Sequence, residues 1–206
     1  NIPVIFCAVS DPVAAGLVKS MDKPGENCTG TSDVLDFTLH VNMIKAFQPD
    51  VKTIGVIYTT SEENSLTQLK NLRAVCDAAG IAVETASVQG ASDVPAAAAA
   101  VAAKSDCILN FTDNNVVQNL SAVLAAAENA KIPVYGSEEE QVKNGCAASM
   151  SIDYVALGKL TGGLAVKVMR GTPAEELAVE KLSEALPVIN EAALGAVGIS
   201  VPAEYA

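Results

Sequence analysis

The sequence has no tryptophan, one histidine and five cysteines among its 206 residues, and only 4% of its residues are aromatic. The cysteines are odd in number and form no CxxC pair, which disfavours a zinc site or a disulfide framework. Cys7, Cys76 and Cys107 lie in apolar patterns, where a free thiol behaves as a small hydrophobe. His40 has no serine, cysteine or aspartate partner in a motif, so we expect no catalytic residue and no metal site.

Clustered positive charge is also missing. The net charge is -11, and no group of lysines or arginines is placed to follow a phosphate backbone, so nucleic acid is excluded as a partner. No apolar run reaches the roughly 18 residues that a membrane span requires. The chain is 50% hydrophobic, however, and is long enough to bury a sizeable core.

Short runs rich in β-branched residues alternate with helical patterns along the middle of the chain. The runs are TIGVIY (53–58), IAVETASV (81–88), CILNF (107–111) and IPVYG (132–136). Their spacing fits one strand, one helix and two short loops in each repeat. Parallel strands joined by right-handed helical crossovers form a doubly wound α/β sheet, which is the fold class we predict. After the first run, Ser65 and Gln68 predict a capping box for a helix that Gly80 ends.

Ligands of doubly wound sheets gather beyond the carboxyl ends of the strands. The residues predicted at that edge carry oxygen or amide groups: Thr59, Thr60, the segment SEENS (61–65), Thr112, Asp113, Asn114, Ser137 and Glu138. Lys52, Lys104 and Lys131 come just before strands and therefore belong to the opposite edge. A binding edge without lysine argues against a nucleotide or sugar phosphate and predicts a neutral or zwitterionic small molecule.

Six segments resemble, in order, the landmarks of the ABC-transporter substrate-binding lipoproteins whose best-known members bind tryptophan and tyrosine. They are NIPVIFCAVSDPVAAGLV, KPGENCTGTSD, IGVIYTTSEENS, FTDNNVV, IPVYGSEEEQVKNG and SIDYVALGKLTGGLAVKVMRG. The likeness runs from Asn1 to about Gly171, and the tail after it matches more weakly.

The resemblance implies a type I periplasmic-binding-protein fold, in which two Rossmann-like lobes close on a ligand by a hinge. In full-length members of the family, a lipoprotein signal, an anchor cysteine and the first βα units of lobe one precede the segment that matches Asn1. We therefore expect lobe one to be incomplete in this chain. The expected division is part of lobe one in 1–32, a complete lobe two in 33–150, and crossover and return segments, mainly of lobe one, in 151–206.

The resemblance also implies a function. The chain is expected to be the extracytoplasmic solute-binding component of an ABC importer, a periplasmic or cell-surface lipoprotein that docks on an ABC permease. The expected ligand is a small amino acid-like molecule, with an aromatic amino acid favoured, held in an interlobe cleft. No cofactor and no catalysis are expected, and membrane contact is expected only through a lipid anchor in the missing N-terminal part.

Two alternatives to a transport function stay open. One is a ligand-sensing domain of a regulator with the same fold, and the other is a small-molecule enzyme on a flavodoxin-like fold. The enzyme has little support, because the sequence contains neither GxGxxG nor GxxxxGK[ST] and no Ser/His or Cys/His arrangement. Asp113 and Glu138 are a carboxylate pair available for acid/base chemistry, but their separation does not follow from the sequence.

A free amino acid needs separate partners for its carboxylate and its ammonium. Helix N-termini with nearby hydroxyls suit the carboxylate; Asn64 and Ser65 open one helix, and Thr112, Asp113 and Asn114 open the next. The ammonium needs an ionised acceptor. Asp113 is the first choice for it, and Glu138 and Asp11 are the reserves.

Three of these residue types also have a purely structural use. Asp113, Asn114 and Ser65 are residues that helices favour as N-caps without any ligand. Capping and ligand contact therefore both remain open for them.

Further candidates come from strand ends and turns. Ser10 and Asp11, just before Pro12, are candidate contacts from lobe one or simply the start of a turn and helix. Ser137 stands at the top of the last strand of the ladder.

An aromatic ligand would also need an apolar slot. Tyr58, Phe111 and Tyr135 either contribute to that slot or belong to the core.

Overall fold

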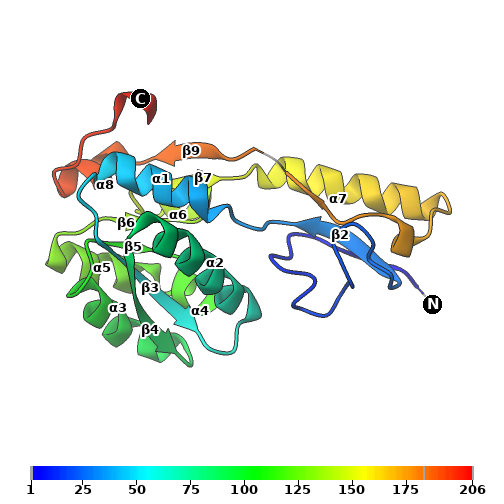
Figure 1. Cartoon of the computed structure of the whole chain (residues 1–206), viewed down its shortest axis with the longest axis horizontal. Coiled ribbons are helices and arrows are strands. Elements are labelled where there is room, and N and C mark those ends of the chain that lie inside the picture. The colour runs from blue at the N-terminus through cyan, green and yellow to red at the C-terminus, as the bar shows by residue number, and fades with distance from the viewer. Residues whose placement is uncertain (1, 183, 206) are drawn as a thin grey trace. The chain divides into compact units, whose positions relative to one another are not determined.

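The computed structural model describes residues 2–182 and 184–205 and divides into two compact units (Figure 1). Unit 1 comprises Asn1–Leu35 and Ile152–Ala185, and unit 2 comprises Asp36–Ser151 and Leu186–Ala206. Asn1, the first residue of the segments that resemble the family, lies outside the described residues. No helix in the described part of the chain combines the length and the apolar character that a membrane crossing requires.

Unit 2 is built on the predicted ladder of strands and helices. Its elements in chain order are α1 (Phe37–Phe47), β3 (Thr53–Thr59), α2 (Glu63–Ala79), β4 (Ala82–Val88), η1 (Ala91–Asp93), α3 (Val94–Ala102), β5 (Cys107–Leu109), α4 (Asn114–Gln118), α5 (Leu120–Ala130), β6 (Val134–Tyr135), α6 (Glu139–Lys143), β7 (Ala148–Ser151), β9 (Leu186–Ile189), α8 (Glu191–Ala196) and η3 (Ala203–Tyr205). Strands β4, β3, β5 and β6 form a parallel sheet in that order. The predicted α/β fold with parallel strands is therefore confirmed.

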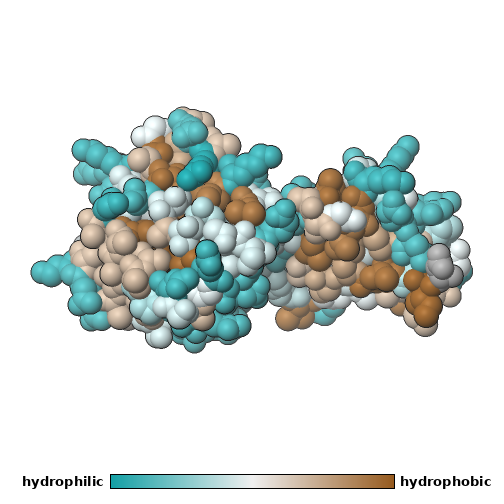
Figure 2. Space-filling view, turned by 90° about the horizontal axis from the view of Figure 1, so that it is seen from below, coloured by the Kyte–Doolittle hydropathy of each residue, from teal (hydrophilic) through white to brown (hydrophobic). Residues whose placement is uncertain are grey.

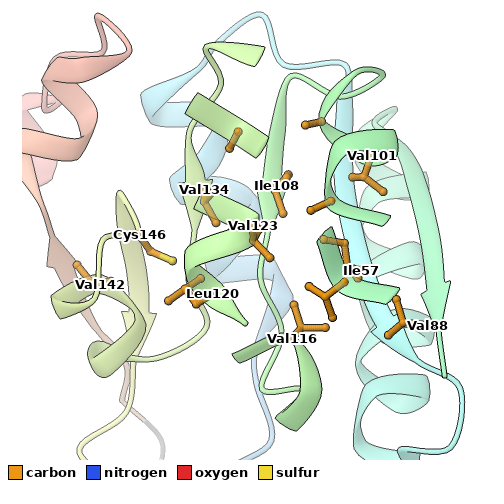
Figure 3. Packing of buried hydrophobic residues seen from close by; sticks show 14 residues of the cluster. Ile57, Val88, Val101, Ile108, Val116, Leu120, Val123, Val134, Val142 and Cys146 are labelled. Carbon is orange, nitrogen blue, oxygen red and sulfur yellow. The ribbon is translucent and has the colours of Figure 1, made fainter. Parts of the chain in front are cut away.

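Helices cover both faces of the unit 2 sheet. On one face, Ile57 and Ile108 pack with side chains of α3, α4 and α5 in a buried apolar cluster, as Figure 3 shows. Neighbouring residues on a strand point to opposite faces, so Cys107 points away from Ile108. On that second face Cys107 lies near Cys76 of α2. Burial, with smaller contributions from Asp106 and Cys76, raises the pKa of Cys107.

Burial away from water makes the thiols of unit 2 unreactive and lets them pack as apolar groups. Cys76, Cys107 and Cys146 are free and buried, and burial raises the pKa of Cys76 to about 11. These three cysteines act as small apolar side chains, because the thiolate is the reactive form. Cys7 differs from its predicted place in an apolar pattern, since it is exposed.

The last part of the chain divides between the two units. Residues 151–206 were expected to hold crossover and return segments, mainly of lobe one; Ile152–Ala185 lies in unit 1, whereas Leu186–Ala206 lies in unit 2. Strand β9 pairs antiparallel with β7. Backbone hydrogen bonds from Gly136 to Ala148 and from Ala147 to Val134 then connect β7 to β6. The tail is held in unit 2 by this pairing, which the repeat pattern of the ladder does not contain.

Unit 1 is smaller and less well covered. Its elements are β1 (Val4–Phe6), β2 (Cys28–Ser32), α7 (Tyr154–Met169), η2 (Ala174–Glu176) and β8 (Glu180–Lys181). The three strands form a parallel sheet in the order β1-β2-β8, against which α7 packs. The buried cluster of this unit is Phe6, Val18 and Val179. Val4, Val155 and Met169 are more than half exposed, and Figure 2 shows apolar surface on this unit.

His40 is a buried titratable group in unit 2, on α1, with 1% of its surface exposed. Its Nδ1 lies 3.0 Å from the carbonyl oxygen of Asp36, so Nδ1 carries the proton and donates it. Its Nε2 is buried without a hydrogen-bond partner among the described residues. Burial lowers the pKa of His40, and the contact with Asp36 offsets this effect only in part.

We expect acid to destabilise the protein through His40. Between the lowered pKa of the folded state and the ordinary value of about 6.5, the unfolded state binds more protons, so stability falls as pH drops below about 6.5. One group contributes a slope of at most about 1.4 kcal/mol per pH unit. Urea unfolding at several pH values should give a smaller slope for His40→Gln than for the wild type. Equal slopes would contradict the assignment.

Candidate functional site

Polar side chains gather where β3, β5 and β6 end. We call these residues the rim: Thr59, Glu62, Asn64, Ser65, Gln68, Asn110, Thr112, Asp113, Asn114, Ser137, Glu138 and Gln141. The three strands are parallel, so their carboxyl ends meet at one edge of the sheet. The sequence predicted nine of these residues at that edge, Glu62 among them only as part of the segment 61–65.

Asp113 lies at the centre of the rim and is fully buried. Its Oδ2 accepts hydrogen bonds from the Thr59 N–H at 2.6 Å and the Ser65 hydroxyl at 2.7 Å. Its Oδ1 accepts from the Thr59 hydroxyl at 2.8 Å and, as the N-cap of α4, from the Val116 N–H at 3.1 Å. Four donors fill the lone-pair positions of a carboxylate. Asp113 therefore ties β3, α2 and α4 together, and these four protein donors favour the capping alternative over the predicted contact with a ligand ammonium.

Ser65 also differs from its predicted role as a helix cap. Helix α2 begins at Glu63 with Glu62 as the N-cap, so Ser65 lies inside the first turn. Its hydroxyl is buried and donates to Asp113. Gln68, the predicted partner in a capping box, instead exchanges hydrogen bonds with Thr112: its Nε2 donates to the Thr112 hydroxyl at 2.6 Å, and its Oε1 accepts from the Thr112 N–H at 3.2 Å.

Glu62 is a rim residue that sequence reasoning did not single out. Its Oε2 accepts from both the N–H and the side-chain amide of Asn114, at 3.0 and 2.8 Å. Asn64 donates to the Thr112 carbonyl at 2.9 Å. These bonds join the start of α2 to the start of α4. The signal for Glu62 was its position in the SEENS segment, directly after β3.

A second group of bonds lies where β5 and β6 end and at the start of α6. Ser137 is buried, and its hydroxyl donates to the Asn110 carbonyl at 2.7 Å. Glu138 is the N-cap of α6, where its carboxylate accepts from the N–H groups of Glu140 and Gln141 at 2.7 and 2.9 Å. Its side chain is half-buried, in contrast to Asp113. Glu138 thus combines capping with access to solvent.

A cavity of about 310 Å³ opens at the rim. Its lining consists of Thr112, Asp113, Asn114, Val117, Gln118, Glu138 and Gln141. Four residues predicted from the sequence therefore share one cavity, whereas Asn64, Ser65 and Ser137 support it from outside the lining.

The aromatic candidates Phe111 and Tyr135 belong to the core rather than to this cavity. Both are fully buried. The Phe111 ring packs on Phe37 with centroids 5.6 Å apart, and the Tyr135 hydroxyl donates to Gln48 at 3.1 Å. The core alternative, rather than an apolar slot, therefore describes these two side chains. Tyr58 on β3 is half-buried.

The two candidates from the N-terminal segment lie in unit 1, in the loop after β1. The Ser10 hydroxyl donates to Oδ1 of Asp33 at 2.9 Å. Asp11 accepts from the Ala14 N–H at 2.9 Å, as its turn alternative requires. Sequence reasoning missed Asp33, because it put the boundary between the lobes at that residue. The available signal was that Asp33 directly follows β2, as the Ser10 loop follows β1.

Parallel sheets in both units and a polar carboxyl edge on the sheet of unit 2 are features of the type I periplasmic-binding-protein fold, and this chain has that fold. The family within this fold class is also shown. Residues 1–205 match the family described as "ABC transporter substrate binding protein", and the chain belongs to that family.

Similar proteins come from several bacteria. The tyrosine-binding protein of Clostridioides difficile is 39% identical over 196 residues, which are 95% of this chain and 57% of that relative. A structure of the ABC domain in complex with L-Trp from Streptococcus pneumonia is 36% identical, with a TM-score of 0.94, over 98% of this chain and 69% of that one. A conserved domain protein from Vibrio cholerae has the same TM-score at 35% identity over the same shares of the two chains.

A regulator shares the fold at lower similarity. A LacI family transcriptional regulator from Arthrobacter, in complex with lactose, is 18% identical with a TM-score of 0.62, over 91% of this chain and 70% of that one. Identity at this level shows the fold alone. It carries no evidence for the regulatory alternative.

Proposed function

We propose that this chain belongs to the extracytoplasmic solute-binding component of an ABC importer and that it captures a small amino acid, with an aromatic amino acid favoured. The match to the family over residues 1–205 carries the proposal. The ligands of two relatives support the choice of substrate, since one is a tyrosine-binding protein and the other is in complex with L-Trp. The expected partner is an ABC permease, and a lipid anchor would hold the protein at the membrane or cell surface.

The chemistry of the rim supports a ligand without net charge. The described lining of its cavity offers hydroxyl, amide and carboxylate groups and contains no lysine or arginine. A phosphate ligand would be repelled by Glu138 and would find no cation there. Thr112, Asn114 and Glu138 line this cavity and are our proposed ligand contacts in unit 2. Asp113 also lines it but is held by protein donors, and Asn64, Ser65 and Ser137 support the cavity from outside its lining.

We also propose that the protein binds its solute without transforming it. Acid/base catalysis by the pair Asp113 and Glu138 would need an accessible carboxylate at both positions. Asp113 is buried and accepts four hydrogen bonds from the protein itself. Its acceptor positions are therefore taken by protein donors, and ligand binding is the use of this site that its geometry favours.

A thermal-shift screen of the twenty amino acids on the full chain tests this function. A ligand that binds only the folded state raises the melting temperature. At about one hundred times its Kd it adds about 2.7 kcal/mol, or about 5–10 °C for a chain of this size. We expect L-tryptophan or L-tyrosine to give such a shift.

Two other compounds serve as controls in the same screen. A neutral sugar and an acidic metabolite should leave the melting temperature unchanged. A shift with either of them, and none with an aromatic amino acid, would contradict the proposed ligand class.

A further inference from the structure

Three polar side chains of unit 1 meet at the carboxyl edge of its sheet. Ser10 follows β1, Asp33 follows β2, and Tyr154 is the first residue of α7. Strands β1 and β2 are parallel, so the loops after them emerge at the same edge. These residues are far apart in sequence, and the fold of unit 1 alone brings them together. We call them the Asp33 cluster.

The bonds within the Asp33 cluster all end on the carboxylate of Asp33. Its Oδ1 accepts from the Ser10 hydroxyl at 2.9 Å, and its Oδ2 accepts from the Tyr154 hydroxyl at 3.2 Å. Asp33 is 8% exposed, whereas Tyr154 is 38% exposed. The carboxylate is thus held in a fixed orientation, and the cluster reaches the surface of unit 1 through the tyrosine.

The partners of Asp33 are neutral. Within residues 2–182 and 184–205, Asp33 takes part in none of the ion pairs that lysine side chains form. Desolvation raises the pKa of Asp33, although hydrogen bonds from Ser10, Tyr154 and its own backbone act in the opposite direction. A buried carboxylate of this kind gains most from a cation that brings hydrogen-bond donors with it.

Comparison with Asp113 separates a structural carboxylate from one that suits a ligand. Asp113 accepts two hydrogen bonds on each oxygen and is completely buried. Asp33 accepts one side-chain hydrogen bond on each oxygen and a further one from its own backbone. A carboxylate offers about four acceptor positions, so Asp33 keeps a position for a donor of an ammonium group. Asp113 does not.

We infer that the Asp33 cluster binds the ammonium group of a primary amine, with Asp33 as the acceptor and with Ser10 and Tyr154 as the residues that position its carboxylate. The inference rests on the proposed function, in which that amine is the α-amino group of the amino acid. It replaces Asp113 with Asp33 as the residue that recognises the ammonium. A lysine side chain of another polypeptide segment offers the same chemistry, and the test separates these two sources.

The test compares Asp33→Asn with the wild type by calorimetric titration of the full chain. The titrants are L-tryptophan and indole-3-propionate, which has the same ring and carboxylate but no amino group. Loss of one partner from a buried charge pair costs roughly 30-fold or more in affinity. We expect the affinity of Asp33→Asn for L-tryptophan to be lower than that of the wild type by that factor. Its affinity for indole-3-propionate should equal that of the wild type.

Asp153→Asn is the matched control. Asp153 lies in the same unit, is exposed, and caps α7 through the Ala156 N–H at 2.9 Å. Asparagine caps helices as well as aspartate does, so this variant should bind both titrants like the wild type. Melting temperatures of all three proteins show whether each is folded, and we expect Asp33→Asn to melt no lower than the wild type.

Three results overturn the inference. The first is that Asp33→Asn keeps its affinity for L-tryptophan within about threefold, a change of only about 0.7 kcal/mol. The second is that its affinities for L-tryptophan and indole-3-propionate fall by the same factor, which would make Asp33 a structural residue. The third is that n-propylammonium raises the melting temperatures of the wild type and of Asp33→Asn by the same amount in a thermal-shift assay.

The same data separate the inference from the proposed function. If the wild type binds no amino acid but n-propylammonium stabilises it through Asp33, the cluster is an ammonium site for another source, such as a lysine side chain. In that case the proposed function fails while the inference stands. If the wild type binds L-tryptophan and Asp33→Asn binds it equally well, the proposed function stands and the inference fails.

Discussion

Asp113→Ala is expected to lower the free energy of unfolding by about 3–5 kcal/mol, because it removes the acceptor of four buried hydrogen bonds. The hydroxyls of Thr59 and Ser65 are able to rotate toward other acceptors. The N–H groups of Thr59 and Val116 are fixed by the backbone, and each unsatisfied donor costs about 1–3 kcal/mol. Chemical denaturation of the wild type and the variant measures the difference.

Asp36→Ala is the matched control for Asp113→Ala. Asp36 is also an aspartate N-cap in unit 2, but it is exposed and accepts from one backbone donor, the Thr38 N–H, at 2.8 Å. Its loss should cost about 1 kcal/mol, as for an ordinary cap. If Asp113→Ala costs no more than this, Asp113 is only a helix cap and the description of the rim is wrong.

A double-mutant cycle tests whether the rim acts as one network. Residues that share a hydrogen-bond network show coupling energies of about 0.5–3 kcal/mol. Ser65→Ala should therefore destabilise the wild type clearly but have a smaller effect in the Asp113→Ala background, where its hydroxyl has already lost its acceptor. Additive effects would show that Ser65 contributes independently.

The repeat pattern of strands and helices predicted the architecture of unit 2. Strands follow one another at nearly constant spacing, and parallel strands place their carboxyl ends at one edge. This reasoning brought Ser65 and Asp113 to the same edge although 48 positions separate them. It did not predict their hydrogen bond, because the depth of a side chain depends on where its helix begins. Helix α2 begins at Glu63, and that start turns Ser65 inward.

Local sequence patterns did not predict the contacts between segments that are far apart in the chain. The Asp33 cluster joins residues 10, 33 and 154. Their positions after β1, after β2 and at the start of α7 indicate a common edge only once the pairing of the strands is known. The pairing of β9 with β7 is similar, since LPVIN reads as a short irregular segment until a partner strand is known. Periodicity predicts which elements form, whereas the closure of a tail onto a sheet depends on tertiary contacts.

The number of hydrogen bonds that a carboxylate already accepts from the protein determines whether it has acceptor positions left for a ligand. The acceptor positions of Asp113 are all taken by protein donors, and Asp113 stabilises one fixed arrangement of β3, α2 and α4. Asp33 accepts fewer side-chain hydrogen bonds, and it is the carboxylate that we infer to bind an ammonium group. The two carboxylates, each within its own unit, therefore suit different uses.

The second large effect concerns unit 1. Gly30→Ala is expected to destabilise this unit by about 3 kcal/mol, since a Cβ on Gly30 would overlap the carbonyl oxygen and the ring of Phe6. Gly30 and Phe6 are register partners in the β1–β2 pair, and Phe6 belongs to the small buried cluster of unit 1. The strands must move apart to admit a methyl group. Hydrogen exchange followed by mass spectrometry should show faster exchange in peptides covering β1 and β2.

Substitution by alanine is expected to increase stability at Gly163, whereas it decreases stability at Gly30. This residue is exposed within α7, and a Cβ built on it meets no described atom within 4 Å. Alanine there should stabilise the helix by about 1 kcal/mol, because glycine is a poor residue for a helix interior. Slower exchange in α7 for Gly163→Ala, together with faster exchange in β1 and β2 for Gly30→Ala, would tie the effect to the Gly30 contact. Unchanged exchange in Gly30→Ala would mean that β1 and β2 are not packed as described.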